Sequence, residues 1–310
     1  MPSQEKTSGG RASRGALIMA FAAIYIIWGS TYLGIRVAVE TIPPFLMAGM
    51  RFVISGVLVF SFMILKGTPW PSLRQWRDQA FVGVSLLLGG NAVVSWAELQ
   101  VPSGITCLIL GSSPLIVVGI DWIRPGGQRP TPLLLFGVLV GIGGLALLLG
   151  PGVFPTGSRP SAGAIAALLI SSVFWWIGSF YSKHAVKDPP PLLMASSMQM
   201  LAGCVSILLV SFCLGEFGRL NLHTITLASW SAFSYLVVVG SIIAFPVYSF
   251  LLENSTPAKV STFAYVNPVV AVILGWAILG EPLNLRIGIA AVIILGAVAL
   301  ITIRRAKLAR

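Results

Sequence analysis

Ten apolar stretches, each about 20 residues long, constrain this chain more than any other feature of its sequence. A helix needs about 20 apolar residues to cross the hydrocarbon core of a bilayer. Lipid offers no hydrogen-bond partners, so a helix, which satisfies its own backbone, is the form expected for each stretch. We therefore predict an all-α polytopic membrane protein with ten transmembrane helices, over residues 16–36, 44–65, 79–98, 103–122, 132–150, 161–183, 191–214, 226–251, 257–279 and 283–303.

The composition excludes several other classes of protein. Of the 310 residues, 56% are hydrophobic and 9% are charged, whereas about a quarter are charged in a typical soluble domain. A soluble globule needs more polar surface than this, and disordered chains are poor in apolar residues. We expect no nucleic-acid partner, because the net charge of +11 is not carried by a soluble basic domain. The lipid bilayer and a small-molecule substrate are the expected partners.

Motifs for chemistry are sparse in this sequence. The three cysteines, Cys107, Cys204 and Cys213, lie in apolar runs and match no metal-binding spacing. The sequence contains neither H-E-x-x-H nor a P-loop, and both histidines fall in predicted loops. We predict no catalytic residue, no metal and no cofactor, which disfavours an intramembrane enzyme. A channel, the other rival class, would need a polar pore or a ring of charge that the pattern lacks.

The distribution of Lys and Arg predicts how the chain is threaded through the membrane. With the N-terminus in the cytoplasm, fifteen of these residues fall on the cytoplasmic side. Four fall outside, namely Arg36, Arg159, Arg219 and Arg286, and Arg51 lies within a span. Cytoplasmic loops carry the excess of basic residues in membrane proteins. We therefore predict a multi-pass protein of the inner (plasma) membrane with both termini in the cytoplasm.

The two halves of the chain resemble each other. A shift of 147 residues aligns 28–52 with 175–199 without a gap and places Trp175 on Trp28. A looser match relates the segment from Val101 to Pro114 with that from Thr256 to Pro268. We predict a first repeat over residues 1–150, a linker over 151–160, a second repeat over 161–303 and a basic cytoplasmic tail over 304–310.

Five helices in each repeat have a topological consequence. An odd number makes the second copy enter the membrane from the opposite side, which gives an inverted repeat. The loop charges fit this inversion. Residues 66–78 after the second helix have a net charge of +2, whereas residues 214–225 after the seventh have a net charge of zero. Inverted repeats build carriers that open one central site alternately to the two sides of the membrane. The sequence thus favours alternating access.

Several short motifs resemble the EamA domain of the drug/metabolite transporter superfamily. They are Trp28-Gly29, Pro43-Pro44, Arg51, Ser113-Pro114, Asn267-Pro268 and Leu279-Gly280-Glu281-Pro282. The chain departs from the pattern where Arg124-Pro125-Gly126-Gly127 replaces the Leu-Gly-Glu segment and where Trp176-Ile177-Gly178 replaces Trp-Gly. The resemblance covers nearly the whole chain, as two tandem copies.

This resemblance implies a ten-helix transporter with a central cavity built mainly from the first, third, fourth, sixth, eighth and ninth helices. Similar bacterial proteins export amino acids, nucleosides and organic cations, and the chain is most similar to exporters of aromatic amino acids and paraquat-like dications. We expect it to export small metabolites, aromatic amino acids foremost, and drug-like organic cations. A channel-like or facilitated-diffusion pore without ion coupling is the alternative, because no carboxylate lies at the middle of a predicted span.

Aromatic and polar residues on the predicted helices are the candidate substrate contacts. Aromatic walls with a few hydrogen-bonding groups suit a flat, partly apolar ligand, through stacking and cation–π contact. Packing between helices and an aromatic belt at the membrane interface are the alternatives. Glu98 is also the best candidate for proton coupling. The predicted set is Tyr25, Trp28, Asn91, Ser95, Glu98, Ser112, Trp175, Trp176, Tyr248, Tyr265 and Asn267.

Five further residues lie inside predicted spans. Pro114 and Pro268 each remove a backbone hydrogen bond and are interpreted either as hinges for alternating access or as static kinks. Because a charge in the membrane is costly, Arg51 is interpreted either as a contact to a substrate or to a carboxylate, or as a snorkelling side chain or a structural pair with helix-end carbonyls. Gly137 and Gly141 form a face of small residues, for which we expect packing within one molecule and hence a monomer rather than a dimer.

Overall fold

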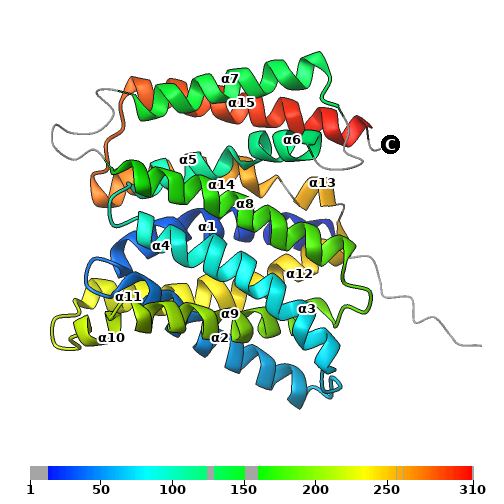
Figure 1. The fold of residues 1–310 in the computed structure, drawn as a ribbon, viewed down its shortest axis with the longest axis vertical. Coiled ribbons are helices and arrows are strands. Elements are labelled where there is room, and N and C mark those ends of the chain that lie inside the picture. The colour runs from blue at the N-terminus through cyan, green and yellow to red at the C-terminus, as the bar shows by residue number, and fades with distance from the viewer. Residues whose placement is uncertain (1–12, 124–128, 151–159, 256, 261, 309–310) are drawn as a thin grey trace, which may run out of the picture.

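Every regular element among the described residues is a helix. The computed structural model describes residues 13–123, 129–150, 160–255, 257–260 and 262–308. The first half contains α1 (Arg14–Ala38), α2 (Pro44–Leu65), α3 (Leu73–Gly83), η1 (Val84–Ala92), α4 (Val93–Ala97), α5 (Ser103–Gly111), α6 (Ser113–Ile123) and α7 (Pro132–Leu149). The second contains α8 (Ala162–His184), α9 (Leu192–Cys213), α10 (Glu216–Arg219), α11 (Leu227–Val237), η2 (Val238–Ile243), α12 (Ala244–Asn254), α13 (Pro257–Val260), α14 (Phe263–Leu279) and α15 (Leu285–Leu308). The helices lie side by side, with their ends gathered at two opposite edges (Figure 1).

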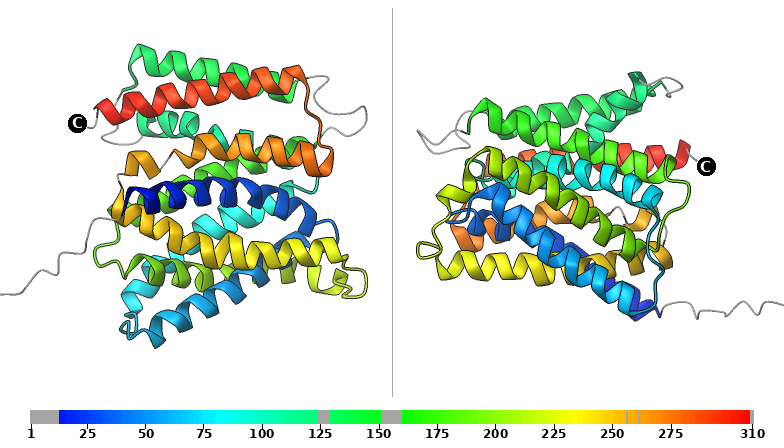
Figure 2. Two further views of the ribbon diagram at one scale, coloured as in Figure 1. Left: turned by 180° about the vertical axis from the view of Figure 1, so that it is seen from behind. Right: turned by 60° about the horizontal axis from the view of Figure 1, so that its bottom comes forward.

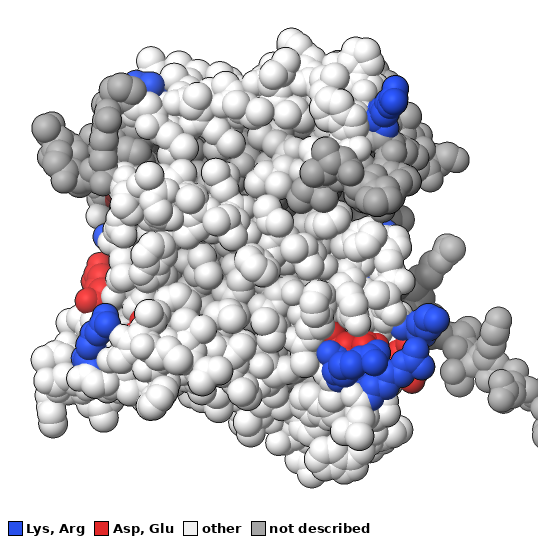
Figure 3. Space-filling model, viewed as in Figure 1, with Lys and Arg blue, Asp and Glu red and all other residues white. Residues whose placement is uncertain are grey.

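The surface of the bundle suits a lipid environment. Eight described helical segments are long and apolar enough to cross a membrane, and two shorter apolar helices, Ser103–Ile116 and Phe263–Leu279, lie in the other two predicted spans. Figure 3 shows Lys, Arg, Asp and Glu near the edges of the face it presents, with an uncharged band between them. The all-α prediction is confirmed, whereas ten crossings and the orientation of the termini stay predictions.

Some helix boundaries differ from those predicted. The third apolar helix begins at Leu73 rather than at residue 79, because Ser72 and Gln75 form a capping box, with N–O distances of 2.9 and 3.2 Å. The two spans of residues 103–122 and 257–279 are not continuous helices but are divided into α5 with α6 and α13 with α14. Helix α15 continues into the predicted tail, and residues 151–159 of the predicted linker lie outside the described part.

Helices that correspond in the two halves pack as antiparallel pairs. The carboxylate of Glu216, after the end of α9, accepts a hydrogen bond from the N–H of Leu46 at the start of α2 (2.7 Å). Arg286, at the start of α15, donates to the carbonyl of Leu147 at the end of α7 (2.8 Å). The α7–α15 contact is close because Gly137 faces the side chain of Ile301. The end of α14 likewise lies at the start of α5, as described below.

The first and sixth apolar helices are exchanged between the halves. Helix α1 packs against α11, α12 and α14 of the second half, and α8 packs against η1, α4 and α6 of the first. Seen from behind, α1 (dark blue) runs between α14 (orange) and α12 (yellow), as Figure 2 shows. Each half therefore contains a central helix whose neighbours belong mainly to the other half.

Two π-helical segments occupy matching places in the third and eighth apolar helices. Each follows an 11-residue α-helix, η1 after α3 and η2 after α11. Both α-helices begin with a hydroxyl cap, Ser72 or Thr226, which accepts a hydrogen bond from the N–H three residues later. A π-helix widens the backbone turn, and such segments are frequent at functional sites.

Candidate functional site

Four aromatic rings form a cluster at the packing of α1 against the second half. The indole of Trp28 on α1 lies 4.8 Å from the ring of Tyr248 and 4.9 Å from that of Phe263, between centroids. Phe245 completes the cluster, 6.4 Å from Trp28. The edge-to-face contact of Trp28 with Phe263 has the geometry that aromatic pairs prefer. We call Trp28, Phe245, Tyr248 and Phe263 the aromatic cluster.

Two other predicted residues hold the helices that carry this cluster. The hydroxyl of Tyr25 lies 2.5 Å from that of Thr262, just before α14. The amide of Asn267, oriented to satisfy its surroundings, donates to the carbonyl oxygens of Phe263 (3.0 Å) and Tyr25 (3.2 Å). Asn267 thus joins α1 to α14 directly before Pro268. The structure therefore brings Tyr25, Trp28, Tyr248 and Asn267 together in one region.

Glu98 lies apart from the aromatic cluster, in the connection between α4 and α5. Its side chain is fully buried, and neither carboxylate oxygen has a hydrogen-bond partner among the described residues. Tyr32, Cys107, Glu281 and the guanidinium of Arg36 lie close enough to interact with it electrostatically, and the guanidinium of Arg36 also donates to the backbone carbonyl of Glu98. A buried carboxylate without donors is favoured in its protonated, neutral form.

The remaining predicted contacts are dispersed over the bundle. Ser95 and Ser112 donate to carbonyl oxygens of their own helices, at 3.1 and 2.6 Å, and the buried Oδ1 of Asn91 has no partner among the described residues. Trp176 stacks on Phe180. Two further predicted aromatic residues point elsewhere: Trp175 packs on Gly90 of η1, and Tyr265 packs into the core beside α15.

The two predicted hinge prolines have different settings. Pro114 lies directly after the interruption at Ser112, near the start of α6, so it begins a helix rather than bending one. Pro268 lies inside α14, and its ring faces Gly111 at the end of α5. Their role as hinges stays a prediction.

Two carboxylates that the sequence did not single out as functional cap helices at one edge of the bundle. Glu281 accepts hydrogen bonds from the backbone N–H groups of Ser103 (2.7 Å) and Gly104 (3.0 Å), at the start of α5. Gly275 makes room for it, since a Cβ there would lie 2.3 Å from Glu281 Oε2. Glu216 caps α2 in the same way and also accepts from Ser211. Carboxylates suit helix N-termini because of the partial positive charge there.

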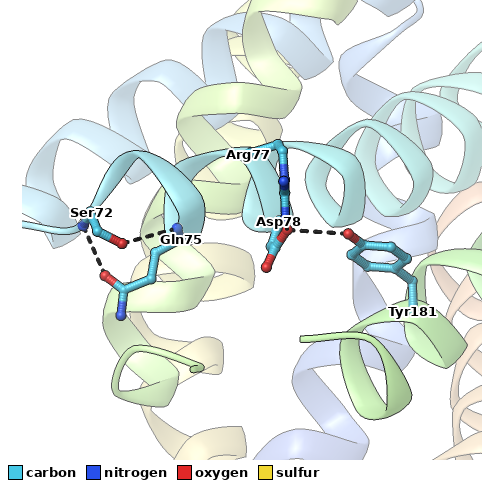
Figure 4. Close-up of polar contacts among 5 residues, drawn as sticks. All are labelled: Ser72, Gln75, Arg77, Asp78 and Tyr181. Atoms are coloured by element: carbon cyan, nitrogen blue, oxygen red, sulfur yellow. Dashed lines mark hydrogen bonds and ion pairs between the residues drawn. The ribbon is translucent and has the colours of Figure 1, made fainter. Parts of the chain in front are cut away.

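The opposite edge contains a polar network between the halves. Asp78 on α3 accepts hydrogen bonds from Arg77 (2.8 Å) and from the hydroxyl of Tyr181 on α8 (3.2 Å). Figure 4 shows Tyr181 pointing at Asp78, one turn beyond the Ser72–Gln75 cap. Asp78 is 4% exposed. No group of three or more His, Cys, Asp or Glu that could hold a metal occurs among the described residues.

The residues that the sequence analysis missed share one property: their partners lie far away in the chain. Phe245 and Phe263 are ordinary members of apolar runs, and only the fold places them beside Trp28. Glu281 stood in a recognised motif, but its hydrogen bonds reach a helix 177 residues away. Spacing within a single helix carries no signal for such contacts.

The fold and the uncharged surface band define an integral membrane protein with many apolar helices. The sequence profile of the EamA-like transporter family matches residues 14–150 and again 162–303. The chain belongs to the EamA-like transporter family, and it is a multi-pass protein of the inner membrane.

Relatives with similar sequences are named as transporters. The chain is 38% identical over 288 residues to the uncharacterized inner membrane transporter YedA of Escherichia coli (strain K12), which covers 93% of this chain and 90% of that protein. It is 24% identical to the uncharacterized transporter YoaV of Bacillus subtilis (strain 168), over 90% and 94% of the two chains. A chain in a solved crystal structure is similar with a TM-score of 0.62 and 21% identity, covering 95% of this chain and 99% of that one. This structural likeness shows the fold.

Proposed function

We propose that this protein exports small metabolites, aromatic amino acids foremost, together with drug-like organic cations, by alternating access through a site between its two halves. The observation that carries this proposal is the exchange of α1 and α8, each of which packs against the other half. When one half rocks against the other, such a central helix separates from its neighbours first on one side of the membrane and then on the other.

The antiparallel pairing of corresponding helices supports an inverted arrangement of the halves. The hydrogen bonds of Glu216 to α2 and of Glu281 to α5 join the end of a second-half helix to the start of its first-half counterpart. The two halves then have opposite orientations in the membrane. That symmetry provides two states of similar energy, one open to each side.

The aromatic cluster supports an aromatic or cationic substrate. Trp28 belongs to the first half, whereas Phe245, Tyr248 and Phe263 belong to the second. A flat ring inserted between Trp28 and Tyr248 would replace the contact between these two rings with one contact to each of them. An organic cation would gain cation–π attraction from the same ring faces. The site would therefore bind such ligands only while the halves are partly separated.

Glu98 supports coupling to protons. A carboxylate that is buried without a donor binds a proton, and solvent access during the cycle would let it release that proton. Exchange of an outgoing substrate for an incoming proton would then be driven by the proton gradient. Without such coupling the protein would equilibrate its substrate.

Flux through the purified protein in proteoliposomes tests the proposal. We expect saturable uptake and counterflow of L-phenylalanine, accelerated by a pH gradient and reduced at least about tenfold in Trp28→Ala, the loss expected when about 1.4 kcal/mol or more of aromatic contact is removed. The exposed Trp70→Ala is the matched control and should leave flux unchanged. Non-saturating flux without counterflow would instead indicate a channel. No flux of any aromatic or aliphatic amino acid or of an organic cation would contradict a transporter of this kind.

A further inference from the structure

Arg51 is a buried cation inside the apolar part of α2. It is the eighth residue of the helix, which places it about 10 Å along the axis from the first. Its side chain is 4% exposed. An ionised side chain at such a position in a membrane protein is costly to keep and usually marks a functional site.

The described partners of Arg51 include no carboxylate. Its Nε donates to the hydroxyl of Ser241 (2.9 Å) and its Nη2 to the carbonyl of Gly240 (3.3 Å). The buried Nη1 has no partner among the described residues. Its guanidinium carbon lies 5.1 Å from the centroid of the Phe52 ring, and the phenol of Tyr235 interacts with it electrostatically, so its described surroundings provide dipoles and a π face but no carboxylate.

The π-helix η2 builds the cradle for this guanidinium. Ser241 donates its own hydroxyl hydrogen to the carbonyl of Leu236 (3.0 Å), five residues earlier, so its oxygen is free to accept from Arg51. A Cβ on Gly240 would lie 3.3 Å from Arg51 Nη2 and 3.1 Å from the methyl of Thr31. The missing side chain thus allows α1, α2 and η2 to meet around the cation.

The cradle and the aromatic cluster are adjacent along the same two helices. Thr31 donates to the carbonyl of Trp28, three residues before it on α1 (2.7 Å). On the other side, Gly240 of η2 precedes Phe245 of α12 by five residues. The two groups are therefore neighbours along these helices, as the carboxylate and the ring of one bound aromatic amino acid would require.

We propose that Arg51, held by Gly240 and Ser241 of η2, binds the carboxylate of the transported amino acid. This inference rests on the proposed function and specifies its substrate class as α-amino acids. A carboxylate on Nη1 would neutralise the buried charge and form a charge-assisted hydrogen bond. Because Arg51 belongs to the first half and η2 to the second, separation of the halves in the transport cycle opens the guanidinium to the ligand.

Two probes that differ in one group test this assignment: L-phenylalanine and 2-phenylethylamine, which lacks the carboxylate. Flux of both into proteoliposomes of the full chain is measured at mildly acidic pH, where the amine stays protonated. In Arg51→Gln we expect kcat/KM for L-phenylalanine to fall about 10- to 100-fold, the effect of losing a hydrogen bond to a charged group. Flux of 2-phenylethylamine should stay within about twofold of the wild type, and Arg51→Lys should recover part of the L-phenylalanine flux.

The controls separate this proposal from the carrier function. Arg219→Gln removes an exposed arginine whose partner is a backbone carbonyl, and it should change neither flux. Equal losses for both probes in a folded Arg51→Gln protein would assign Arg51 a structural role and overturn the proposal. If Arg51→Gln does not fold, inhibition of wild-type 2-phenylethylamine flux by L-phenylalanine but not by its methyl ester supports the proposal, and equal inhibition by both overturns it. If the wild type transports 2-phenylethylamine but not L-phenylalanine, the proposed carboxylate site is overturned and the proposed carrier function stands. If it transports neither probe, both proposals are overturned.

Discussion

Glu281 shows how a single residue can join distant parts of an apolar bundle. Its carboxylate is bound by two backbone N–H groups of α5 rather than by a cation. Gly280 ends α14 in the left-handed conformation, with φ of 63°, which turns the chain so that the next side chain points back at α5. Ser103 and Gly104 are buried, so these donors need a partner from the protein itself.

Replacing this carboxylate should destabilise the protein. Glu281→Ala leaves the N–H groups of Ser103 and Gly104 without acceptors, at a cost of about 1–3 kcal/mol for each buried group. Glu281→Gln keeps an acceptor and should cost less. Thermal unfolding in detergent measures both, with the exposed Glu40→Ala as the control, expected to match the wild type. An unchanged melting temperature in Glu281→Ala would contradict the capping role.

Glu98→Gln should separate binding from coupling. The amide is nearly isosteric with the protonated carboxyl, so the fold and substrate counterflow should persist, whereas the acceleration of flux by a pH gradient should disappear. Counterflow and gradient-driven flux of L-phenylalanine in the same proteoliposomes give the two readouts. A variant that still responds to the gradient as the wild type does would exclude Glu98 as the coupling residue.

The sequence predicted part of the candidate site at this scale. Tyr25, Trp28, Tyr248 and Asn267 were predicted and lie together, because aromatic and polar residues in apolar helices are few and tend to cluster. The environment of Arg51 could not be predicted, since its acceptors are provided by a π-helix 190 residues away.

Among the elements, α3 and α8 are joined at one edge of the bundle. The hydroxyl of Tyr181 donates to Asp78 (3.2 Å), and the Tyr181 ring packs 4.4 Å from that of Phe81. The neighbouring α3–α9 contact includes a hydrogen bond from Gln199 to Gln79 (2.7 Å). These two hydrogen bonds and the ring contact connect the first half to the second at a single edge of the bundle.

Removing the hydrogen bond between α3 and α8 should lower the stability of the protein slightly. Tyr181→Phe keeps the ring contact and removes the hydroxyl, so it should lower stability by about 0.5–1.5 kcal/mol. In an Asp78→Ala background the same change should have no further effect, because the acceptor is already absent. Thermal unfolding of the wild type, Tyr181→Phe, Asp78→Ala and the double variant completes this double-mutant cycle. Additive effects of the two substitutions would show that the pair does not interact.

Helix positions were largely predictable, and helix interruptions were not. Apolar length alone located a helical segment in each of the ten predicted spans. The start of α3 was missed because Arg74, Arg77 and Asp78 lower the local hydropathy, although the Ser72–Gln75 cap was readable from the sequence. The π-helices depend on packing between halves, so η1 and η2 leave no mark in hydropathy.

For the whole molecule, the orientation in the membrane can be tested with a native thiol. Cys213 is exposed at the end of α9, whereas Cys107 and Cys204 are buried. If the N-terminus is cytoplasmic, a membrane-impermeant maleimide should label Cys213 from outside intact spheroplasts. Pro69→Cys in a Cys213→Ser background places a thiol in an exposed position at the other edge and should react only after permeabilisation. The reverse pattern would invert the predicted topology.

The placement of the two capping carboxylates means that the first half is not a self-sufficient module. Glu216 and Glu281 both belong to the second half, yet both complete helices of the first. In the second half, Glu216 follows Gly215, which has a positive φ. The first half also has a glycine with positive φ at the matching place, Gly67, but the residue after it is Thr68. Two copies of residues 1–150 could therefore not replace the natural pair, whereas the two different halves, co-expressed as separate chains, should assemble into a working transporter.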